Sequence, residues 1–410
     1  MRNFILLAGA TTLAACGGGS GAGPETVGSI APPAGPVTSV TPTPTQTTAS
    51  FVNPAEPKTY EGIGAVEHYG YKTRSDASGQ YDQLYAGDAN TVRDGGVSVT
   101  YNPRDAIFEL TIAREKGIVT ANNRFQDPAH RTDFGGAVQP QAGTPEIADR
   151  GIQYLQAGSG TGVSVGVPGG YRKGEAGYES STTTFFYQKP GTTTKFVSYA
   201  GWLRNNLSVS KQSKTTVDPV TGGETQSDYL EYSYGLDRAA FAYGERSAAS
   251  AVPRSGSGSY TGDVLATMVY NTAIDTDPRS PTYFQWLVGS QTTNVDFGTL
   301  GVSTALTGKL TAPTLDANTT GLHTLAEGTT LTANARSTLD LVTKGGFTGA
   351  FTDAKFKTPG GSELVVAIAG SSIDGAFFGP SAEEIGGGFR IVGGTPDERV
   401  DILGTFTGKK

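Results

Sequence analysis

The chain has 410 residues and a formal net charge of −7, from 31 Lys and Arg against 38 Asp and Glu, and it contains no block of basic residues. A mildly acidic chain without a basic patch offers no phosphate-binding surface, which excludes nucleic acid from the expected partners. Glycine accounts for 58 residues without a collagen-like period, and aromatic and β-branched residues accompany it. This composition is typical of β structure rich in turns.

The first residues have the organisation of an export signal. A basic start is followed by an apolar run, Phe4–Ala8, that is too short to span a bilayer, and then by the small residues Leu13–Ala15. This order resembles a bacterial lipoprotein signal, so we expect a signal peptide over residues 1–15 and acylation of Cys16, which would anchor the protein in outer-membrane lipid. An ordinary secretory signal with a chance cysteine is the alternative. Gly17, in place of an acidic residue, resembles the pattern of lipoproteins exported to the outer membrane.

Residues 16–50 are rich in Gly, Pro and Thr and almost free of charged and large side chains. Such a segment cannot bury enough apolar surface to become ordered, so we expect a disordered tether. A flexible coil of this length spans roughly 30 Å on average.

Roughly 360 residues follow the tether, too many for one ordinary core, and we expect two domains, 51–241 and 242–410. The first is predicted to be β-rich with little helix, and its strand-like segments alternate with long polar loops such as 122–145. Loops of that length are often functional. The strand-like segments are Tyr60–Tyr71, Ala106–Ala113, Thr183–Gln188 and Lys195–Leu203.

The second domain contains short strand patterns separated by glycine turns. In the first of them, alternate residues from Tyr260 to Met268 fall on one face. Eight or nine such strands without a convincing helix predict a closed, eight-stranded antiparallel β-barrel, with a β-sandwich as the alternative. The expected fold class is therefore mainly all-β. The predicted strands are Gly258–Tyr270, Phe284–Ser290, Val302–Leu310, Thr330–Ala335, Phe347–Lys357, Glu363–Gly370, Ile373–Gly379, Gly388–Gly393 and Asp401–Gly408.

Four residues are candidates for ligand binding. His68, Tyr69 and Tyr71 lie close together in a tyrosine-rich stretch, and His130 lies in a long polar loop. Histidine and tyrosine are both axial ligands of haem iron, and aromatic rings suit a flat porphyrin. Strand packing is the alternative for the aromatic stretch, and a solvated loop is the alternative for His130. No metal site is predicted, because the three histidines and the single cysteine lack metal-ligand spacing.

Two weaker motifs suggest other chemistry. Gly162–Gly166 fits the nucleophile string G-x-S-x-G around Ser164, but Pro168 and two glycines follow where a helix is required. Asp275–Asp277 hints at a calcium loop, for which Pro278 and the missing distal glutamate make a solvated turn the better interpretation. We expect no catalytic residues, and a secreted hydrolase rests on Ser164 alone.

The last strands carry the most specific pattern. Asp374–Gly393, DGAFFGPSAEEIGGGFRIVG, followed by Ile402–Lys410, resembles the closing segment of the barrel domains of the transferrin-binding protein B family. In that family a G-x-F-[FY]-G-P-x-A-x-E-x-G-G-x-F pattern precedes a final G-x-F-x-G strand. Val252–Ala266, Asn294–Leu300 and Gly345–Phe351 resemble earlier barrel strands. The residues that match the pattern are Gly375, Phe377, Phe378, Gly379, Pro380, Ala382, Glu384, Gly386, Gly387 and Phe389.

This resemblance implies a surface lipoprotein in which a β-rich handle domain precedes the barrel. The chain has length for one such lobe, which makes it similar to the single-lobe haem- and haemoglobin-binding relatives more than to a transferrin receptor. The implied partners are a TonB-dependent receptor, a surface lipoprotein translocon, and haem or a carrier protein. Within the pattern, Glu384 is expected to accept hydrogen bonds from backbone donors rather than to act in catalysis.

The leading hypothesis is an outer-membrane lipoprotein that faces the extracellular side, binds a nutrient ligand or its carrier, with haem or another iron source first, and delivers it to a membrane transporter. The alternative is a surface adhesin or structural envelope lipoprotein that uses the barrel as an export module.

Overall fold

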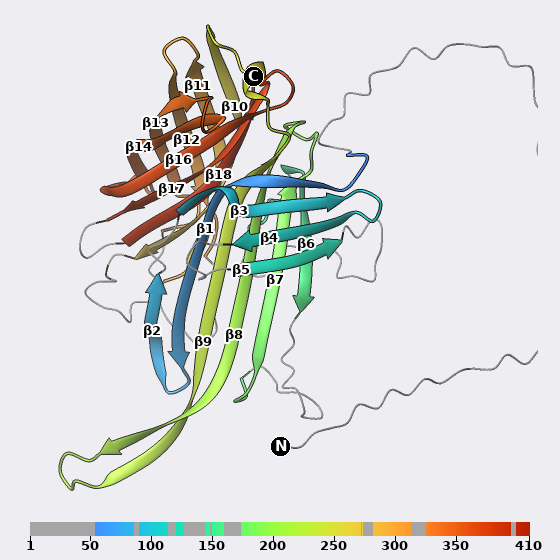
Figure 1. The fold of residues 1–410 in the computed structure, drawn as a ribbon. Helices are drawn as coiled ribbons and strands as arrows, with labels where there is room; N and C mark the ends of the chain where they lie inside the picture. Colours follow the sequence, from blue (N-terminus) through green and yellow to red (C-terminus); the bar gives the residue numbers. More distant parts are fainter. Residues whose placement is uncertain are drawn as a thin grey trace, which may run out of the picture. The chain divides into compact units, whose positions relative to one another are not determined.

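The computed structural model describes residues 54–85, 90–113, 120–126, 144–147, 150–159, 174–271, 273, 282–313, 325–394 and 399–410. The chain divides into two units, Met1–Thr48 and Ala49–Lys410, and the two sheets of the structure both lie in the second unit. Apart from one short 3-10 helix, η2 (Ala249–Ala251), every regular element among the described residues is a β-strand (Figure 1). The all-β prediction is confirmed.

Sheet A is an open antiparallel sheet in the strand order β5-β4-β3-β1-β9-β8-β7-β6, with β2 paired to β1. Its strands are β1 (Lys58–Arg74), β2 (Ala77–Tyr85), β3 (Asn90–Asn102), β4 (Ile107–Ala113), β5 (Thr120–Gln126), β6 (Ile152–Ser159), β7 (Glu179–Gln188), β8 (Val197–Val217) and β9 (Glu224–Gly244). The four predicted strand segments correspond to β1, β4, β7 and β8. The predicted domain boundary falls inside β9, and the division into two domains stays a prediction.

Sheet B is a closed barrel. Eight strands follow one another in the order β13-β12-β11-β10-β18-β17-β16-β14, and β14 pairs back with β13 to complete the circle. The short β15 adds to β14 outside this circle. The strands are β10 (Ser257–Asn271), β11 (Phe284–Asp296), β12 (Gly301–Leu310), β13 (Thr330–Asp340), β14 (Gly346–Lys357), β15 (Glu363–Val365), β16 (Ile368–Phe378), β17 (Glu384–Gly393) and β18 (Arg399–Lys409). The predicted eight-stranded barrel is therefore correct, and the sandwich alternative is not.

Most of the barrel interior is apolar, as the alternation in its first strand predicted, and the buried polar side chains of Gln291, Thr293 and Thr304 are linked there by hydrogen bonds. Tyr260, Val264 and Met268 of β10 are buried in one cluster with the inward side chains of the other barrel strands. The outward residue Leu265 is buried as well, because it packs against Phe186 and other side chains of sheet A. One outer wall of the barrel is thus covered by sheet A. Among the described residues, no helix has the length and apolar character needed to cross a membrane.

Sheet A and the barrel touch through their backbones at two glycines. A Cβ atom on Gly388 of β17 would lie 2.2 Å from the Cα of Gly64 in β1, which is far inside any real contact. Around this point Ala65 and Ala240 of sheet A pack on Leu403 of β18. The missing side chain at Gly388 is therefore what lets the two sheets approach this closely, whereas a Cβ on Gly64 would meet Ala240 and Phe241 of its own sheet.

The hairpin of β8 and β9 extends well beyond its neighbours (Figure 1). Backbone pairing with β7 ends near Val209, and pairing with β1 ends near Leu230, whereas β8 and β9 pair with each other as far as Val217 and Glu224. We call this projecting part, 210–217 with 224–229, the β8–β9 ribbon. Most of its side chains are exposed, and Val220 in the turn at its tip is 90% exposed.

Candidate functional site

The alternation of β1 separates the three candidate residues near its end. His68 is partly buried on the face that encloses the core of sheet A, which also carries Val66. Tyr69 and Tyr71 are buried on the opposite face, where they pack against Phe284 of the barrel. Successive strand residues point to opposite faces of a sheet, so a ligand lying against one face contacts either the imidazole or the tyrosine rings.

A buried carboxylate holds the imidazole of His68. Its Nδ1 lies 2.7 Å from Oδ1 of Asp237, its directly paired residue in β9. The other oxygen of Asp237 accepts from Nε of Arg204 in β8, at 2.7 Å. These three residues form one cross-strand row, which we call the His68 row. In it, the guanidinium and imidazole groups offset the free-energy cost of burying the carboxylate. The exposed part of the row is the His68 side chain, 20% exposed, and Arg204, 23% exposed.

Tyr69 and Tyr71 already have partners. The Tyr69 hydroxyl donates to Oε1 of Gln80 at 2.7 Å, and the same oxygen accepts from the backbone N–H of Thr282 at 2.9 Å. The ring of Tyr71 stacks on Tyr234 with centroids 4.6 Å apart. Haem ligation by either tyrosine requires these contacts to open. Ligand binding by His68, Tyr69 and Tyr71 stays a prediction.

The other candidates fall elsewhere in the chain. Cys16 and His130 lie outside the described residues, as do Ser164 and Asp275–Asp277. In the part of the chain that is described, no three His, Cys, Asp or Glu side chains are grouped closely enough to hold a metal ion.

A second pair of buried charges lies between the sheets and was missed by the sequence analysis. Glu67 and Arg238 are directly paired across β1 and β9, and both are 1% exposed. The Arg238 guanidinium lies 4.7 Å from the ring centroid of Phe284 in the barrel. Burial lowers the pKa of Arg238 to about 10, against the opposing effect of Asp237 and Glu67. The sequence did contain a signal for these buried charges, because the charged residues Asp237 and Arg238 stand inside the apolar run Leu236–Tyr243.

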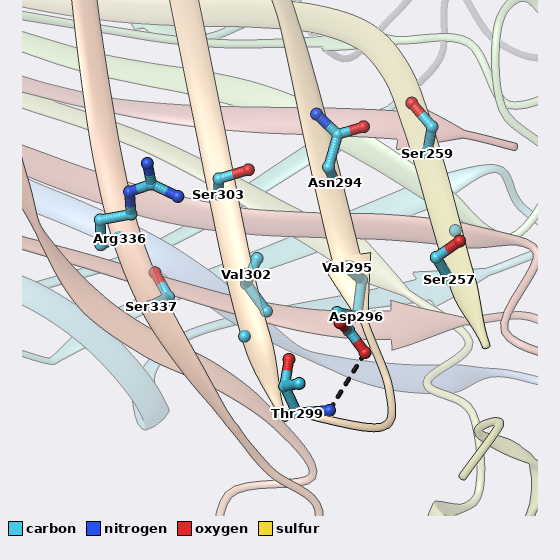
Figure 2. Close-up of a pocket in the computed structure, with 12 residues that line it drawn as sticks. Ser257, Ser259, Asn294, Val295, Asp296, Thr299, Val302, Ser303, Arg336 and Ser337 are labelled. Atoms are coloured by element: carbon cyan, nitrogen blue, oxygen red, sulfur yellow. Dashed lines mark hydrogen bonds between the residues drawn. The ribbon is translucent and has the colours of Figure 1, made fainter. Parts of the chain in front are cut away.

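The described residues also form a hollow on the outer face of the barrel, over β10, β11, β12 and β13, with a volume of about 560 Å³ (Figure 2). Its lining is dominated by small and polar side chains from four strands. The lining residues are Ser257, Gly258, Ser259, Asn294, Val295, Asp296, Thr299, Gly301, Val302, Ser303, Arg336 and Ser337. No sequence signal pointed to it, because strand register alone brings these residues together.

The closing motif of the chain is a structural device. Phe377 and Phe389 lie in the barrel core, and Gly379 adopts a φ of +86° in the turn after β16, a conformation that favours glycine. A Cβ on Gly375 would lie 2.2 Å from the ring of Phe347. The carboxylate of Glu384 accepts backbone hydrogen bonds, as expected, but the donors lie at residues 195–197, where the chain enters β8 of sheet A, rather than in its own turn.

Comparison with known proteins agrees with this geometry. Residues 252–410 match the family described as the C-lobe and N-lobe β-barrels of transferrin-binding protein B. A comparison with curated proteins gave no match.

Three solved structures were among those found. Intact Ap-TbpB (N and C lobes) is 12% identical, with 87% of this chain and 78% of that chain covered and a TM-score of 0.27. The isotype 1 transferrin-binding protein B from serogroup B Neisseria meningitidis is 13% identical, with 87% and 77% covered and a TM-score of 0.22. A structure described as a surface lipoprotein is 17% identical, with 48% and 75% covered and a TM-score of 0.21.

The family match covers all the strands of the barrel, from β10 to β18, and includes the motif around Glu384. Residues 252–410 therefore form a β-barrel domain of the transferrin-binding protein B family.

Proposed function

We propose that this protein is an outer-membrane lipoprotein, anchored through Cys16 and facing outward, that captures an iron source and passes it to a transporter in the same membrane. The observation that carries the proposal is the family match of the barrel over residues 252–410, a family named for the binding of transferrin. The lipoprotein-like leader before Cys16 supports the anchor. A TonB-dependent receptor is the proposed acceptor, and a surface lipoprotein translocon that recognises the barrel is the proposed export partner.

The cargo is haem or an iron-loaded carrier protein. Of the candidate residues, His68 suits haem best, because its ring is fixed by Asp237 through Nδ1 while its side chain remains 20% exposed. An imidazole that gives one nitrogen to a carboxylate presents the other to a metal as a more basic ligand. Binding of a carrier protein would instead use the loops and rims of the β scaffold, where recognition residues are commonly placed.

The cargo is tested with the full chain in two separate titrations, one with haemin and one with iron-loaded and iron-free transferrin. Haem capture predicts a saturable Soret shift that is lost in His68→Gln. His323→Gln is the matched control, because it removes an imidazole from the barrel part of the chain. A carrier receptor predicts saturable binding of the iron-loaded protein instead. If neither cargo binds, iron capture in these two forms is wrong.

The anchor is tested by replacing Cys16 with serine. Wild-type protein is expected in the outer-membrane fraction and accessible to protease added to intact cells, whereas Cys16→Ser is expected to lose its membrane attachment. A Cys16→Ser protein that still fractionates with the outer membrane would contradict the lipid anchor.

One feature favours the alternative of an adhesin or interaction lipoprotein. The β8–β9 ribbon exposes both faces and presents Val220 at its tip, 90% exposed, a geometry suited to contact with another macromolecule. Shortening the ribbon to a tight turn after Val209 tests this role. Loss of cell or surface attachment without loss of iron-source binding would support the adhesin.

A further inference from the structure

The hollow on the barrel contains a row of polar side chains that lie in strict register. Ser259 of β10 pairs with Asn294 of β11, Asn294 pairs with Ser303 of β12, and Ser303 pairs with Arg336 of β13. Figure 2 shows these four side chains side by side on four neighbouring strands. We call them the polar row. Because neighbouring strands lie about 4.8 Å apart, the row extends over about 14 Å.

The side chains of the polar row make no hydrogen bond or ion pair with any other described residue, and all four are at least partly exposed. By contrast, the next outward side chain of β13, Asn334, has a hydrogen-bond partner, since its Nδ2 donates to Oδ1 of Asp353 at 2.8 Å. The polar row thus keeps its two hydroxyls, its amide and its guanidinium open to a ligand. Together they supply both donors and acceptors.

Charge is distributed unevenly along the hollow. Arg336 is the one basic side chain among the lining residues, and it stands at the β13 end. The acidic residue of the lining, Asp296, turns its Oδ1 to the backbone N–H groups of Gly298, at 2.9 Å, and Thr299, at 3.0 Å. The dashed line in Figure 2 marks the second of these bonds. Asp296 is thereby engaged in its own turn, whereas Arg336 faces the hollow without a counter-charge.

The floor of the hollow exists because side chains are missing. Gly301 points outward in β12, next to Ser303, and a Cβ built on it would have only the Thr299 hydroxyl as a close neighbour, at 3.4 Å. The serines on β10 and β12 add little bulk. A larger residue in place of Gly301 would therefore project into the hollow without straining the backbone.

We propose that the hollow binds a short acidic oligosaccharide, with a carboxylate on its terminal sugar held by Arg336 and the hydroxyls of the following sugars held by Ser303, Asn294 and Ser259. A guanidinium offers two parallel N–H donors that match a carboxylate, and hydroxyl and amide side chains exchange hydrogen bonds with sugar hydroxyls. A single cation at one end of a neutral polar row matches a ligand with one charge at one end. This site goes beyond iron capture and does not depend on it.

The test uses the full chain and two probes, 3′-sialyllactose, in which one carboxylate-bearing sugar caps lactose, and lactose itself. Binding is followed by calorimetry and by saturation-transfer NMR. We expect saturable binding of the acidic trisaccharide and much weaker binding of lactose. Arg336→Gln should lower the affinity for the acidic trisaccharide about tenfold or more, because a charge-assisted hydrogen-bond pair is lost. Gly301→Val should abolish binding, because its side chain would occupy the space beside Ser303 where the ligand lies.

The control is Lys309→Gln, which removes one positive charge from β12 outside the hollow and should leave the affinity unchanged. Equal binding of both probes with no effect of Arg336→Gln would overturn the proposed carboxylate recognition. Absence of saturable binding at millimolar concentration, or binding that survives Gly301→Val, would overturn the site. Neither outcome bears on haem or transferrin binding, so failure here is distinguishable from failure of the iron-capture proposal.

Discussion

The carboxylate of Glu384, at the start of β17, accepts a hydrogen bond from the backbone N–H of Phe196, 2.8 Å away and immediately before β8. The same carboxylate also accepts from the N–H groups of Lys195 and Val197, at 2.6 and 3.2 Å. One side chain of the barrel motif therefore satisfies three consecutive backbone donors, two just before β8 of sheet A and one at its first residue. The motif that identifies the barrel is also a clamp between the sheets.

We predict that Glu384→Gln lowers the free energy of unfolding by about 1–3 kcal/mol, because the new amide NH₂ group faces backbone N–H donors and leaves part of them unsatisfied. Urea unfolding measures the change. Glu363→Gln is the matched control, since Glu363 makes only an exposed ion pair with Lys355. Equal losses in the two variants would contradict the role of Glu384.

The pH dependence of that difference has a defined sign. Burial raises the pKa of Glu384 above its usual value of 4.5, although the three backbone donors act in the opposite direction. The folded state therefore holds this proton more tightly than the unfolded chain does, and the contribution of Glu384 declines as the pH rises from 4.5 through the folded pKa. The stability difference between wild type and Glu384→Gln should shrink over that window, as measured by urea unfolding at a series of pH values.

The contact between Gly64 and Gly388 predicts a severe effect of one methyl group. Gly388→Ala places a Cβ at 2.2 Å from the Gly64 Cα and must push the two sheets apart, at a cost of about 1–3 kcal/mol or more. Thermal unfolding should show a lowered midpoint. Gly360→Ala is the control, because its Cβ would meet only the Thr358 hydroxyl, at 3.9 Å. A normal midpoint for Gly388→Ala would show that the sheets can shift without penalty.

The buried pair of Glu67 and Arg238 predicts a non-additive double substitution. Arg238→Met alone should destabilise the protein by about 3–5 kcal/mol, because it leaves the Glu67 carboxylate buried without its cation. Glu67→Leu combined with Arg238→Met should recover most of the loss, since two apolar side chains then fill the space beside Phe284. A thermodynamic cycle of the four proteins measures the coupling, and simple additivity would show that the two charges act independently.

The ion pair between Asp76 and Lys214 of the β8–β9 ribbon predicts a local effect at low pH. Asp76 is bridged by Arg74, with N–O distances of 2.9 and 2.8 Å, and by Lys214 of the ribbon. The hydrogen bonds from Arg74 and then Lys214 lower the pKa of Asp76 to about 2. Because the folded pKa is depressed, the bridge is present above the usual value of 3.8 and is lost only as the pH falls toward 2.

Hydrogen exchange of the ribbon amides tests this. Wild-type protein should keep its protection at pH 3, whereas Asp76→Asn should exchange faster at that pH and at neutral pH alike. Asp353→Asn on the barrel serves as the control and should leave the ribbon unaffected. Identical exchange in all three proteins would mean that the bridge does not order the ribbon.

The barrel could be predicted from the sequence because its strands obey simple local rules. Alternation in β10 identified the inward side chains, and glycine turns separated the strands. The outward burial of Leu265 could not be predicted in this way, because it depends on a partner sheet that lies far away in the chain. The residues of Asp374–Gly393 gave the family through a specific pattern, although the pattern did not reveal that Glu384 binds residues 195–197.

The sites were less accessible to sequence reasoning. His68 and Tyr69 are neighbours in the chain, but strand geometry turns them to opposite faces, and their partners Asp237 and Gln80 come from other strands. The polar row of the hollow depends on the register of four strands, which no local signal fixes. The long extension of β8 and β9 was also missed, since its exposed Ser, Thr and Lys residues lack the alternation that marks a half-buried strand.

The position of β1 has a mechanical consequence. This first strand lies inside sheet A, between β3 and β9, and is in register with β9 over twelve consecutive residues, from Ile63 to Arg74. Hydrogen bonds of an antiparallel pair run perpendicular to the strands, so a force that pulls the chain ahead of Lys58 along the axis of β1 loads many of them in shear at once. A protein held by its N-terminal end in a moving fluid would then unfold only when the hydrogen bonds between β1 and β9 break together, rather than one after another from an edge of the sheet.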